Sequence, residues 1–360
     1  MQDERLWYTL FNSYYSRKTK EIFNKQINKP FNPVYAGFKI TEKCNQHCRH
    51  CWAGKSTKEY DFSDIAKALD RLKEFDVYHL TLTGGEPFCR VDCIDIVRYA
   101  KKNFPVVEVF TNAFLLNEDL IEELSTVLGK NDFIQVSLDG LEDSYKQQRG
   151  IDGYNNVVDN IKKLISAGVN IRINMTATQY NEFDIFNVYK KSIELGCKTF
   201  SLSFVVSLRK GVAVRNETSF TEYERAINLI RLHHNEKKIN MNLRIFTPLE
   251  IKSRYAESIN QEDLIYFNDN VLHWTIDAEG NIYNFIDHYK FKELKIGNIY
   301  SDNVSKINDK NLDIQRKILY KKFTNTKCAN CSLLKSCQGG NYIDNYPNMN
   351  YPGKGCVANV

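Results

Sequence analysis

Three cysteines near the start of the chain have spacing that could support metal chemistry. Cys44, Cys48 and Cys51 form a C-x3-C-x2-C array directly after the strand-like run 34–40. Three closely spaced thiolates can hold three irons of a four-iron cluster and leave the fourth iron without a protein ligand, so that a substrate or cosubstrate can bind there. The array therefore predicts a reactive iron–sulfur site. A zinc knuckle is the alternative, because cysteine and histidine are the usual zinc ligands and two histidines lie inside the array.

A second motif, Gly84-Gly85-Glu86-Pro87, follows about thirty residues later. Two glycines give a turn whose backbone can approach a ligand closely, which side chains would block. The carboxylate of Glu86 could bind that ligand directly, or it could tie the turn to neighbouring backbone amides. The sequence leaves both roles open.

Together with later motifs, the array and the Gly-Gly-Glu-Pro segment resemble the radical S-adenosylmethionine (SAM) family, from about Gly37 to the C-terminus. The resemblance implies a SAM-coordinating 4Fe–4S cluster whose open iron chelates the amino and carboxylate groups of SAM. Reductive cleavage of SAM would then give a 5'-deoxyadenosyl radical that abstracts hydrogen from a substrate. The cofactor would carry the difficult chemistry.

The same resemblance assigns residues to SAM. Gly84 and Gly85 would present a backbone edge to the SAM amino group, with Glu86 beside them. Ser137 and Arg149 would hold the methionyl carboxylate, to which a guanidinium is suited through paired, charge-assisted hydrogen bonds.

Three further assignments to SAM have structural alternatives. Asn112 would lie near the ribose or the methionine, although asparagine at a strand end is often a turn former. His50 would place its ring against the adenine, or it could simply be hydrogen-bonded above the cluster loop. The backbone of Val205 and Val206 would read the adenine, although apolar strand residues are core by default.

Four more cysteines lie near the C-terminus: Cys328, Cys331, Cys337 and Cys356. Their spacing resembles the tail of the SPASM extension of peptide-modifying radical SAM enzymes, in which seven cysteines hold two auxiliary clusters. The ligands of the first auxiliary cluster are missing here, with Phe285 and Asn341 at two of their positions. The resemblance implies one auxiliary 4Fe–4S cluster with four thiolate ligands. A structural zinc site is the alternative.

No catalytic side chain is assigned by the sequence, and only weak candidates are available. Cys89 follows the glycine turn and could return a hydrogen atom in an epimerisation, although a buried free cysteine is usually a small hydrophobe. Asp287 and His288 lie where the missing cluster would leave room for a substrate, although most such side chains have no catalytic role.

Alternating patterns between residues 34 and 206 indicate the elements that position these residues. We expect strands near 34–41, 78–83, 106–111, 132–138, 169–176 and 198–206, with helices near 61–75, 91–103, 116–128, 153–167 and 182–195. Functional residues of βα barrels lie at the carboxyl ends of the strands, and the motifs described above follow strands one to four. The fold class is α/β, and the resemblance implies an open, partial (β/α)6 radical SAM barrel.

The expected organisation has four parts: a helix and linker at 1–33, the partial barrel at 34–236, a connecting region at 237–270, and a small cysteine-rich, SPASM-like auxiliary-cluster domain at 271–360. The last part should begin with a hairpin of Trp274–Ala278 and Asn281–Phe285.

Composition limits the partners and the compartment. A net charge of +5 from 49 basic and 44 acidic residues, scattered along 360 residues, speaks against a nucleic-acid surface. We expect a cytoplasmic protein without membrane contact, because the chain shows neither a signal-peptide pattern nor a run of about 18 apolar residues. The ten cysteines are then better explained as metal or cluster ligands than as disulfides.

The expected substrate is a ribosomally synthesised peptide, modified by cross-linking, epimerisation or oxidation, with flavodoxin or ferredoxin as the electron donor. The alternative is a small-molecule dehydrogenase or epimerase acting on a sugar, an aminocyclitol or a tetrapyrrole. A non-catalytic zinc-binding scaffold is a third hypothesis, but it gives Arg149 and the glycine turn no role.

Overall fold

The computed structural model describes residues 29–53, 56, 58–205, 210, 214, 218–246, 272–284, 288–289, 291–318, 328 and 331. Some of the predicted features lie outside these residues: the first helix, Val206, Phe285, Asp287, Cys337, Asn341 and Cys356.

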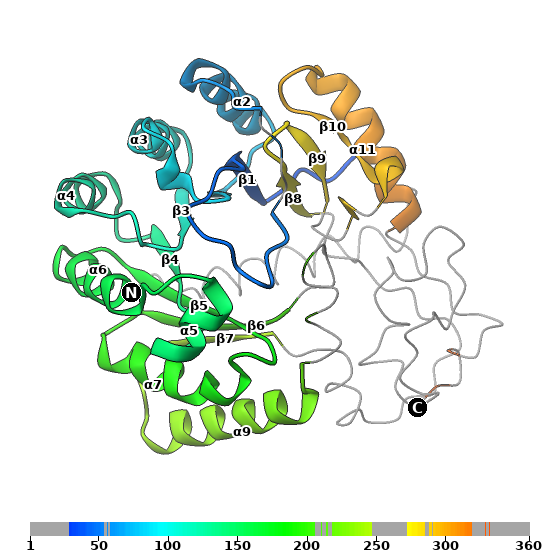
Figure 1. Ribbon diagram of the computed structural model, residues 1–360. Helices are drawn as coiled ribbons and strands as arrows, with labels where there is room; N and C mark the ends of the chain where they lie inside the picture. Colours follow the sequence, from blue (N-terminus) through cyan, green and yellow to red (C-terminus); the bar gives the residue numbers. More distant parts are fainter. Residues whose placement is uncertain are drawn as a thin grey trace.

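One curved sheet organises the described part of the chain, with helices around its outside (Figure 1). The strand order is β10-β9-β8-β1-β2-β3-β4-β5-β6-β7, and every neighbouring pair from β8 to β7 is parallel. The strands are β1 (Tyr35–Thr41), β2 (His79–Gly84), β3 (Val106–Thr111), β4 (Phe133–Ser137), β5 (Ile171–Ala177), β6 (Thr199–Phe204), β7 (Asn242–Ile245), β8 (His273–Ile276), β9 (Asn281–Tyr283) and β10 (Gly297–Asn298).

All six predicted barrel strands are confirmed as β1 to β6. Their side chains are buried nearly throughout, as parallel strands covered by helices require. The helices are α2 (Phe62–Glu74), α3 (Cys93–Asn103), α4 (Glu118–Val127), α5 (Glu142–Arg149), α6 (Tyr154–Ser166), α7 (Ile185–Glu194), α9 (Phe220–Glu236) and α11 (Val304–Ile318), with short 3-10 turns at Pro87–Cys89, Glu182–Asp184 and Lys292–Leu294. The sequence did not predict α5, which carries part of the site.

The sheet extends beyond the six predicted strands at both edges. β7 pairs with β6, inside the region 237–270 to which the sequence assigned no element. On the other side β8 pairs with β1, and β9 and β10 continue the sheet in antiparallel orientation. The C-terminal hairpin is therefore part of the same sheet as the barrel strands. Among the described residues, no helix is long and apolar enough to cross a membrane.

A buried ion pair lies among the strands. Arg172 of β5 pairs with Glu108 of β3, and both side chains are almost fully buried. Burial alone would raise the pKa of Glu108, but the charge of Arg172 and a hydrogen bond from His79 hold it at about 2. Thr81 also donates to this carboxylate, over 3.1 Å. The pair links β2, β3 and β5 across the inside of the sheet.

Candidate functional site

The glycine turn after β2 packs against the chain that leads into the cysteine array. Gly85 N–H donates to Thr41 C=O and Glu86 N–H to Lys43 C=O, each over 2.8 Å. A Cβ on Gly84 would lie 2.3 Å from the Thr41 carbonyl oxygen, and one on Gly85 only 2.2 Å from that of Lys43. The close approach that requires glycine is thus to the protein's own backbone.

Glu86 is held entirely by the protein. Its buried carboxylate accepts hydrogen bonds from Thr111 Oγ1 at 2.7 Å, Asn112 N at 2.6 Å and Phe88 N at 3.3 Å. Burial raises its pKa to about 7, although these three hydrogen bonds oppose the shift. Of the two roles that the sequence left open, the geometry supports the structural one: Glu86 ties the glycine turn to the end of β3.

Asn112 connects the end of β3 with the cysteine array. Its side-chain oxygen accepts from Phe114 N at 3.0 Å, as a turn former does, while Nδ2 donates to Asn45 Oδ1 over 2.8 Å. Both of its side-chain polar atoms are therefore occupied. The same contact fixes Asn45, the residue that follows Cys44.

The three array cysteines are free thiols on one loop, and each sulfur accepts one hydrogen bond. The donors are Gln46 N to Cys44 at 3.4 Å, Arg149 Nη1 to Cys48 at 3.6 Å, and Ala53 N to Cys51 at 3.4 Å. Cys44 is exposed as a residue, but partial burial of its sulfur raises its pKa, against the effect of the Gln46 hydrogen bond. Such donors stabilise thiolates, the form that binds metals.

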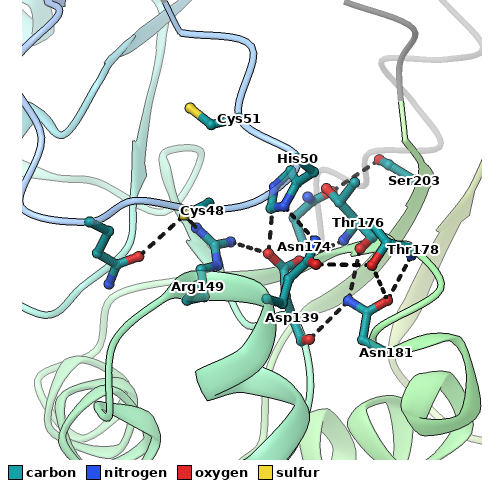
Figure 2. A network of polar contacts seen from close by, with 12 residues as sticks. Cys48, His50, Cys51, Asp139, Arg149, Asn174, Thr176, Thr178, Asn181 and Ser203 are labelled. Carbon is teal, nitrogen blue, oxygen red and sulfur yellow. Dashed lines mark hydrogen bonds and ion pairs between the residues drawn. The ribbon is translucent and has the colours of Figure 1, made fainter. Parts of the chain in front are cut away.

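The donor set fits an iron–sulfur cluster by its chemistry. Among the described residues, no three Cys, His, Asp or Glu side chains converge closely enough to hold a metal ion, so the thiols share a loop without meeting at one point. Figure 2 shows Cys51 apart from the Cys48–Arg149 contact. Three thiols that each accept a hydrogen bond, with Cys48 also donating to Gln46 Oε1 at 3.7 Å, match the ligand type that holds three irons.

A buried charge network lies beside the array (Figure 2). Arg149, at the end of α5, pairs with Asp139 Oδ2 through Nη2 at 2.6 Å, and Thr176 N donates to Asp139 Oδ1 over 2.7 Å. The ring nitrogen Nε2 of His50 lies 3.7 Å from Asp139 Oδ2. Burial works against the charge of Arg149, yet Asp139 and Cys48 raise its pKa.

His50 is held by protein groups. Its Nδ1 contacts Gln148 Nε2. Burial lowers its pKa to about 4, although the negative charge of Asp139 opposes the shift. This geometry agrees with the hydrogen-bonded role that the sequence offered as the alternative to stacking on adenine.

The remaining candidates lie either in the core or at the rim, by which we mean the carboxyl ends of strands β1 to β6 and the loops that follow them. Ser137, half-buried, ends β4 opposite Asn174 of β5, to which Ser203 of β6 donates over 3.2 Å. Val205 is fully buried, like a core residue. Cys89 is half-buried next to the array, where burial and the charge of Glu86 raise its pKa against a hydrogen bond from Asn45 N–H.

His288 and the C-terminal cysteines lie away from this rim in the sequence. His288 is fully buried, and burial lowers its pKa to about 3. Cys328 is buried and Cys331 half-buried, and Cys331 N–H donates to Cys328 C=O over 3.1 Å. This contact brings the backbones of two of the four predicted auxiliary ligands together. The other two lie outside the described residues.

Asp139, Gln148 and Thr178 are rim residues to which the sequence gave no role. Asp139 stands inside the motif 137–140 at the end of a predicted strand, so a buried partner for Arg149 could have been sought there. Gln148 and Thr178 give no such signal, because their contact spans 30 residues and depends on how α5 meets the end of β5.

Comparisons with known proteins agree with this architecture. The sequence model of the Radical SAM superfamily matches residues 38–191. A protein named "Probable GTP 3',8-cyclase" from Saccharolobus islandicus (strain L.S.2.15 / Lassen #1) is 30% identical over 231 residues, which is 61% of this chain and 74% of that protein. "Antilisterial bacteriocin subtilosin biosynthesis protein AlbA" from Bacillus subtilis (strain 168) is 26% identical over 241 residues, 62% of this chain. The chain spans about half (53%) of the length of AlbA.

Solved structures share the fold. Streptococcus suis SuiB bound to precursor peptide SuiA superposes with a TM-score of 0.74 at 19% identity, over 96% of this chain and 80% of that one. anSMEcpe with bound AdoMet gives a TM-score of 0.63 at 17% identity, over 90% of this chain and 92% of that one. The predicted α/β fold is thus shared with both structures.

Proposed function

Since the chain belongs to the radical SAM superfamily, we propose that it reductively cleaves SAM and uses the resulting radical to abstract hydrogen from a ribosomally synthesised peptide. The observation that carries this proposal is the loop of three free thiols, each accepting one hydrogen bond, beside the buried Arg149–Asp139 pair. A scaffold that only bound zinc would not need a buried guanidinium directed at one of the thiols.

Cys44, Cys48 and Cys51 would hold a 4Fe–4S cluster, which when bound supplies the electron that cleaves a sulfur–carbon bond of SAM. Backbone N–H groups and Arg149 offset the negative charge of the thiolates. The guanidinium Nε of Arg149 is buried without a hydrogen-bond partner, although Nη1 and Nη2 are engaged. It is the group best suited to receive the SAM carboxylate, with Ser137 on the neighbouring strand end.

The glycine turn and Asn112 would border SAM while Glu86 fixes the turn from behind. The Cα atoms of Gly84 and Gly85 lie against the loop leading to the array, and Gly85 N–H is bonded to that loop. The carbonyl groups of the two glycines would then contact the SAM amino group. By the resemblance, the backbone of Val205 would border the adenine end, and so would the His50 ring, whose two nitrogens face Gln148 and Asp139. All of these assignments come from the resemblance and from the common rim.

A peptide substrate is supported by two relatives: AlbA, a bacteriocin biosynthesis protein, and SuiB, whose structure has been solved with a precursor peptide. We further propose an auxiliary 4Fe–4S cluster on the four C-terminal cysteines, of which Cys328 and Cys331 are joined by a backbone hydrogen bond. Flavodoxin or ferredoxin would supply the electron.

A small-molecule substrate is the second candidate. The GTP 3',8-cyclase relative has the higher identity, 30%, and the chain covers more of its length than of AlbA. The two candidates share the same first step and differ only in what enters the barrel, so the substrate must be tested directly.

The first experiment measures 5'-deoxyadenosine formed from SAM and dithionite by anaerobically reconstituted protein. Each cleavage takes one electron and releases methionine, and the radical becomes 5'-deoxyadenosine when it gains a hydrogen atom. We expect wild-type protein to form this product. No product from wild-type protein that holds its iron would overturn the proposal.

The second experiment offers GTP and, separately, synthetic peptides encoded by short reading frames beside the gene. Cross-linking or oxidation of a peptide removes two hydrogen atoms and lowers its mass, whereas epimerisation leaves the mass unchanged in H2O and adds one deuterium in D2O if the returned hydrogen is exchangeable. Consumption of GTP with no change in any peptide would favour the small-molecule candidate.

A further inference from the structure

Gln148 is a polar side chain buried completely at the end of α5, with no catalytic role assigned to it so far. Its neighbour Gln147 is exposed. A buried amide must find partners for its donors and its acceptor, because leaving them unpaired costs free energy. The partners that Gln148 has found belong to two other parts of the rim.

One partner is in the cysteine array and the other is beyond β5. Gln148 Nε2 contacts His50 Nδ1, and Gln148 Oε1 accepts from Thr178 Oγ1 over 2.9 Å (Figure 2 shows His50 and Thr178). The backbone carbonyl of Gln148 also accepts from Arg49 N over 3.0 Å. Side chain and backbone together hold residues 49 and 50 against the C-terminal end of α5.

The hydrogen bonds that join His50, Gln148 and Thr178 can all form at once with a single assignment of donors and acceptors. The amide nitrogen Nε2 of Gln148 can only donate, so His50 Nδ1 accepts a hydrogen bond from it. The hydrogen of the neutral ring is then on Nε2, which faces the Asp139 carboxylate at 3.7 Å. The Thr178 hydroxyl is left to donate to Gln148 Oε1, at 2.9 Å, in preference to its longer 3.3 Å contact with Asn181.

The array is thereby held at both ends. The glycine turn and Asn112 fix its first part, through Thr41, Lys43 and Asn45. Its last part, residues 48 to 51, has a different set of contacts, from Arg149 and Gln148 on α5. Gln148 is the member of the second set that reaches across to the end of β5.

We propose that Gln148 is a positioning residue for the cysteine array: through the His50 ring it fixes the Cys48–Cys51 segment against the ends of α5 and β5. This inference deepens the proposed function and rests on it, because the position of this segment matters to chemistry only if the array holds the cluster. Gln148 touches neither cluster nor SAM in this account, and it acts through His50.

The test replaces Gln148 by Met, which has a similar length and makes no hydrogen bond of this kind. Gln147→Met, on the exposed neighbour, is the matched control. The readout is the rate at which a chelator of ferrous iron removes iron from reconstituted protein. Only the kinetic phase that belongs to the array is compared, which is the phase absent from a variant with Cys44, Cys48 and Cys51 changed to Ala. We expect iron loss about tenfold faster in Gln148→Met than in Gln147→Met, the size of effect that one or two hydrogen bonds of a buried amide can have.

A second variant, Thr178→Val, removes the hydrogen bond to Gln148 Oε1 and leaves the Gln148 side chain in place. We expect a two- to fivefold faster loss of iron, and no further acceleration when Thr178→Val is added to Gln148→Met, because both act through one chain of contacts. Thr178→Val also covers the case in which Gln148→Met does not fold.

Iron loss within twofold of the Gln147→Met control, for Gln148→Met or for Thr178→Val alone, would overturn the positioning role. A purely structural role would lower the melting temperature of the iron-free protein while leaving the rate of iron loss unchanged. Failure of the proposed function is separate: it would appear as iron-loaded wild-type protein that forms no 5'-deoxyadenosine, whatever the chelator rates are.

Discussion

Asp139 is the residue that balances charge at the rim. It is fully buried, pairs with Arg149, accepts from the backbone of β5 and faces the ring of His50. A buried guanidinium has little access to water, so the carboxylate opposite it supplies most of the compensation. Through Arg149 this charge also reaches the sulfur of Cys48. Arg149 and Cys48 are thus in contact although they lie 101 residues apart in the sequence.

Replacing Asp139 by Asn should therefore destabilise the protein. Arg149 would keep its charge while losing the paired carboxylate, and breaking one half of a buried pair costs about 3–5 kcal/mol. Urea unfolding of the iron-free protein would measure the change. Asp143→Asn, on an exposed position of α5, is the control and should change stability by less than about 0.5 kcal/mol. A loss below about 1 kcal/mol in Asp139→Asn would contradict the buried pair as described.

A methyl group on Gly85 tests the contact between the glycine turn and the array. Its Cβ would lie 2.2 Å from the carbonyl oxygen of Lys43, which is backbone and cannot rotate away. We expect Gly85→Ala to lose about 1–3 kcal/mol of stability and to retain less iron after reconstitution. Gly129→Ala meets only the Asp132 side chain at 3.4 Å and serves as the control. Equal iron content in the two variants would show that the turn does not support the array.

At the scale of elements, the alternation of β and α segments was readable from the sequence, but the contacts between distant segments were not. The six barrel strands fall where periodicity predicted them, because a buried parallel strand is a continuous apolar run. α5 escaped prediction since it has only eight residues, most of them polar, and is kept by the burial of Ser144, Tyr145, Gln148 and Arg149. β7 is four residues long and half-exposed.

Pairing partners were equally hidden from the sequence. β8 lies beside β1 although Trp274 and Ala36, which face each other, are separated by most of the chain. The sequence left two roles open for Glu86 and could not decide between them, because its partners Thr111 and Asn112 lie at the end of another strand. Local patterns specify elements and rim positions, whereas tertiary packing decides which side chains meet.

The Glu108–Arg172 pair, which joins β3 to β5, makes a pH-dependent contribution to stability. The pKa of Glu108 is about 2 in the folded protein, below its ordinary value of about 4.3, because Arg172 and the hydrogen bond from His79 outweigh burial. A lowered pKa stabilises the folded state above pH 4.3, and this stabilisation is lost as the pH falls towards 2. Its full size is about 3 kcal/mol.

Glu108→Gln removes this contribution and so provides the test. The difference in unfolding free energy between wild-type protein and Glu108→Gln should shrink by about 2 kcal/mol between pH 6 and pH 3, as measured by denaturant unfolding. Titration of groups that do not contact Glu108 is common to both proteins and cancels in the difference. A gap that stays constant over this range would mean that the carboxylate is not held ionised by Arg172.

At the scale of the whole molecule, one sheet joins the barrel to the C-terminal hairpin. β8 lies directly against β1, and β1 leads into the cysteine array, so the hairpin of β8 and β9 is built onto the strand that carries the array. Cys328 and Cys331 then follow α11, which packs on β10 at the edge of this sheet.

The auxiliary cluster can be tested in protein whose Cys44, Cys48 and Cys51 are all changed to Ala. We expect about four irons with matching sulfide per chain after anaerobic reconstitution, because the four C-terminal cysteines supply a full set of thiolate ligands. Changing Cys328 to Ala in the same background should remove this iron. Zinc in place of iron would make the C-terminal site structural and would favour redox-neutral chemistry such as epimerisation.

The central claim is that the cysteine array supports reductive cleavage of SAM. It is tested most directly by the amount of 5'-deoxyadenosine that reconstituted wild-type protein forms from SAM and dithionite, compared with the variant that lacks Cys44, Cys48 and Cys51. We predict product from wild-type protein and none from the variant. Equal amounts from both proteins, or none from iron-loaded wild-type protein, would contradict the account.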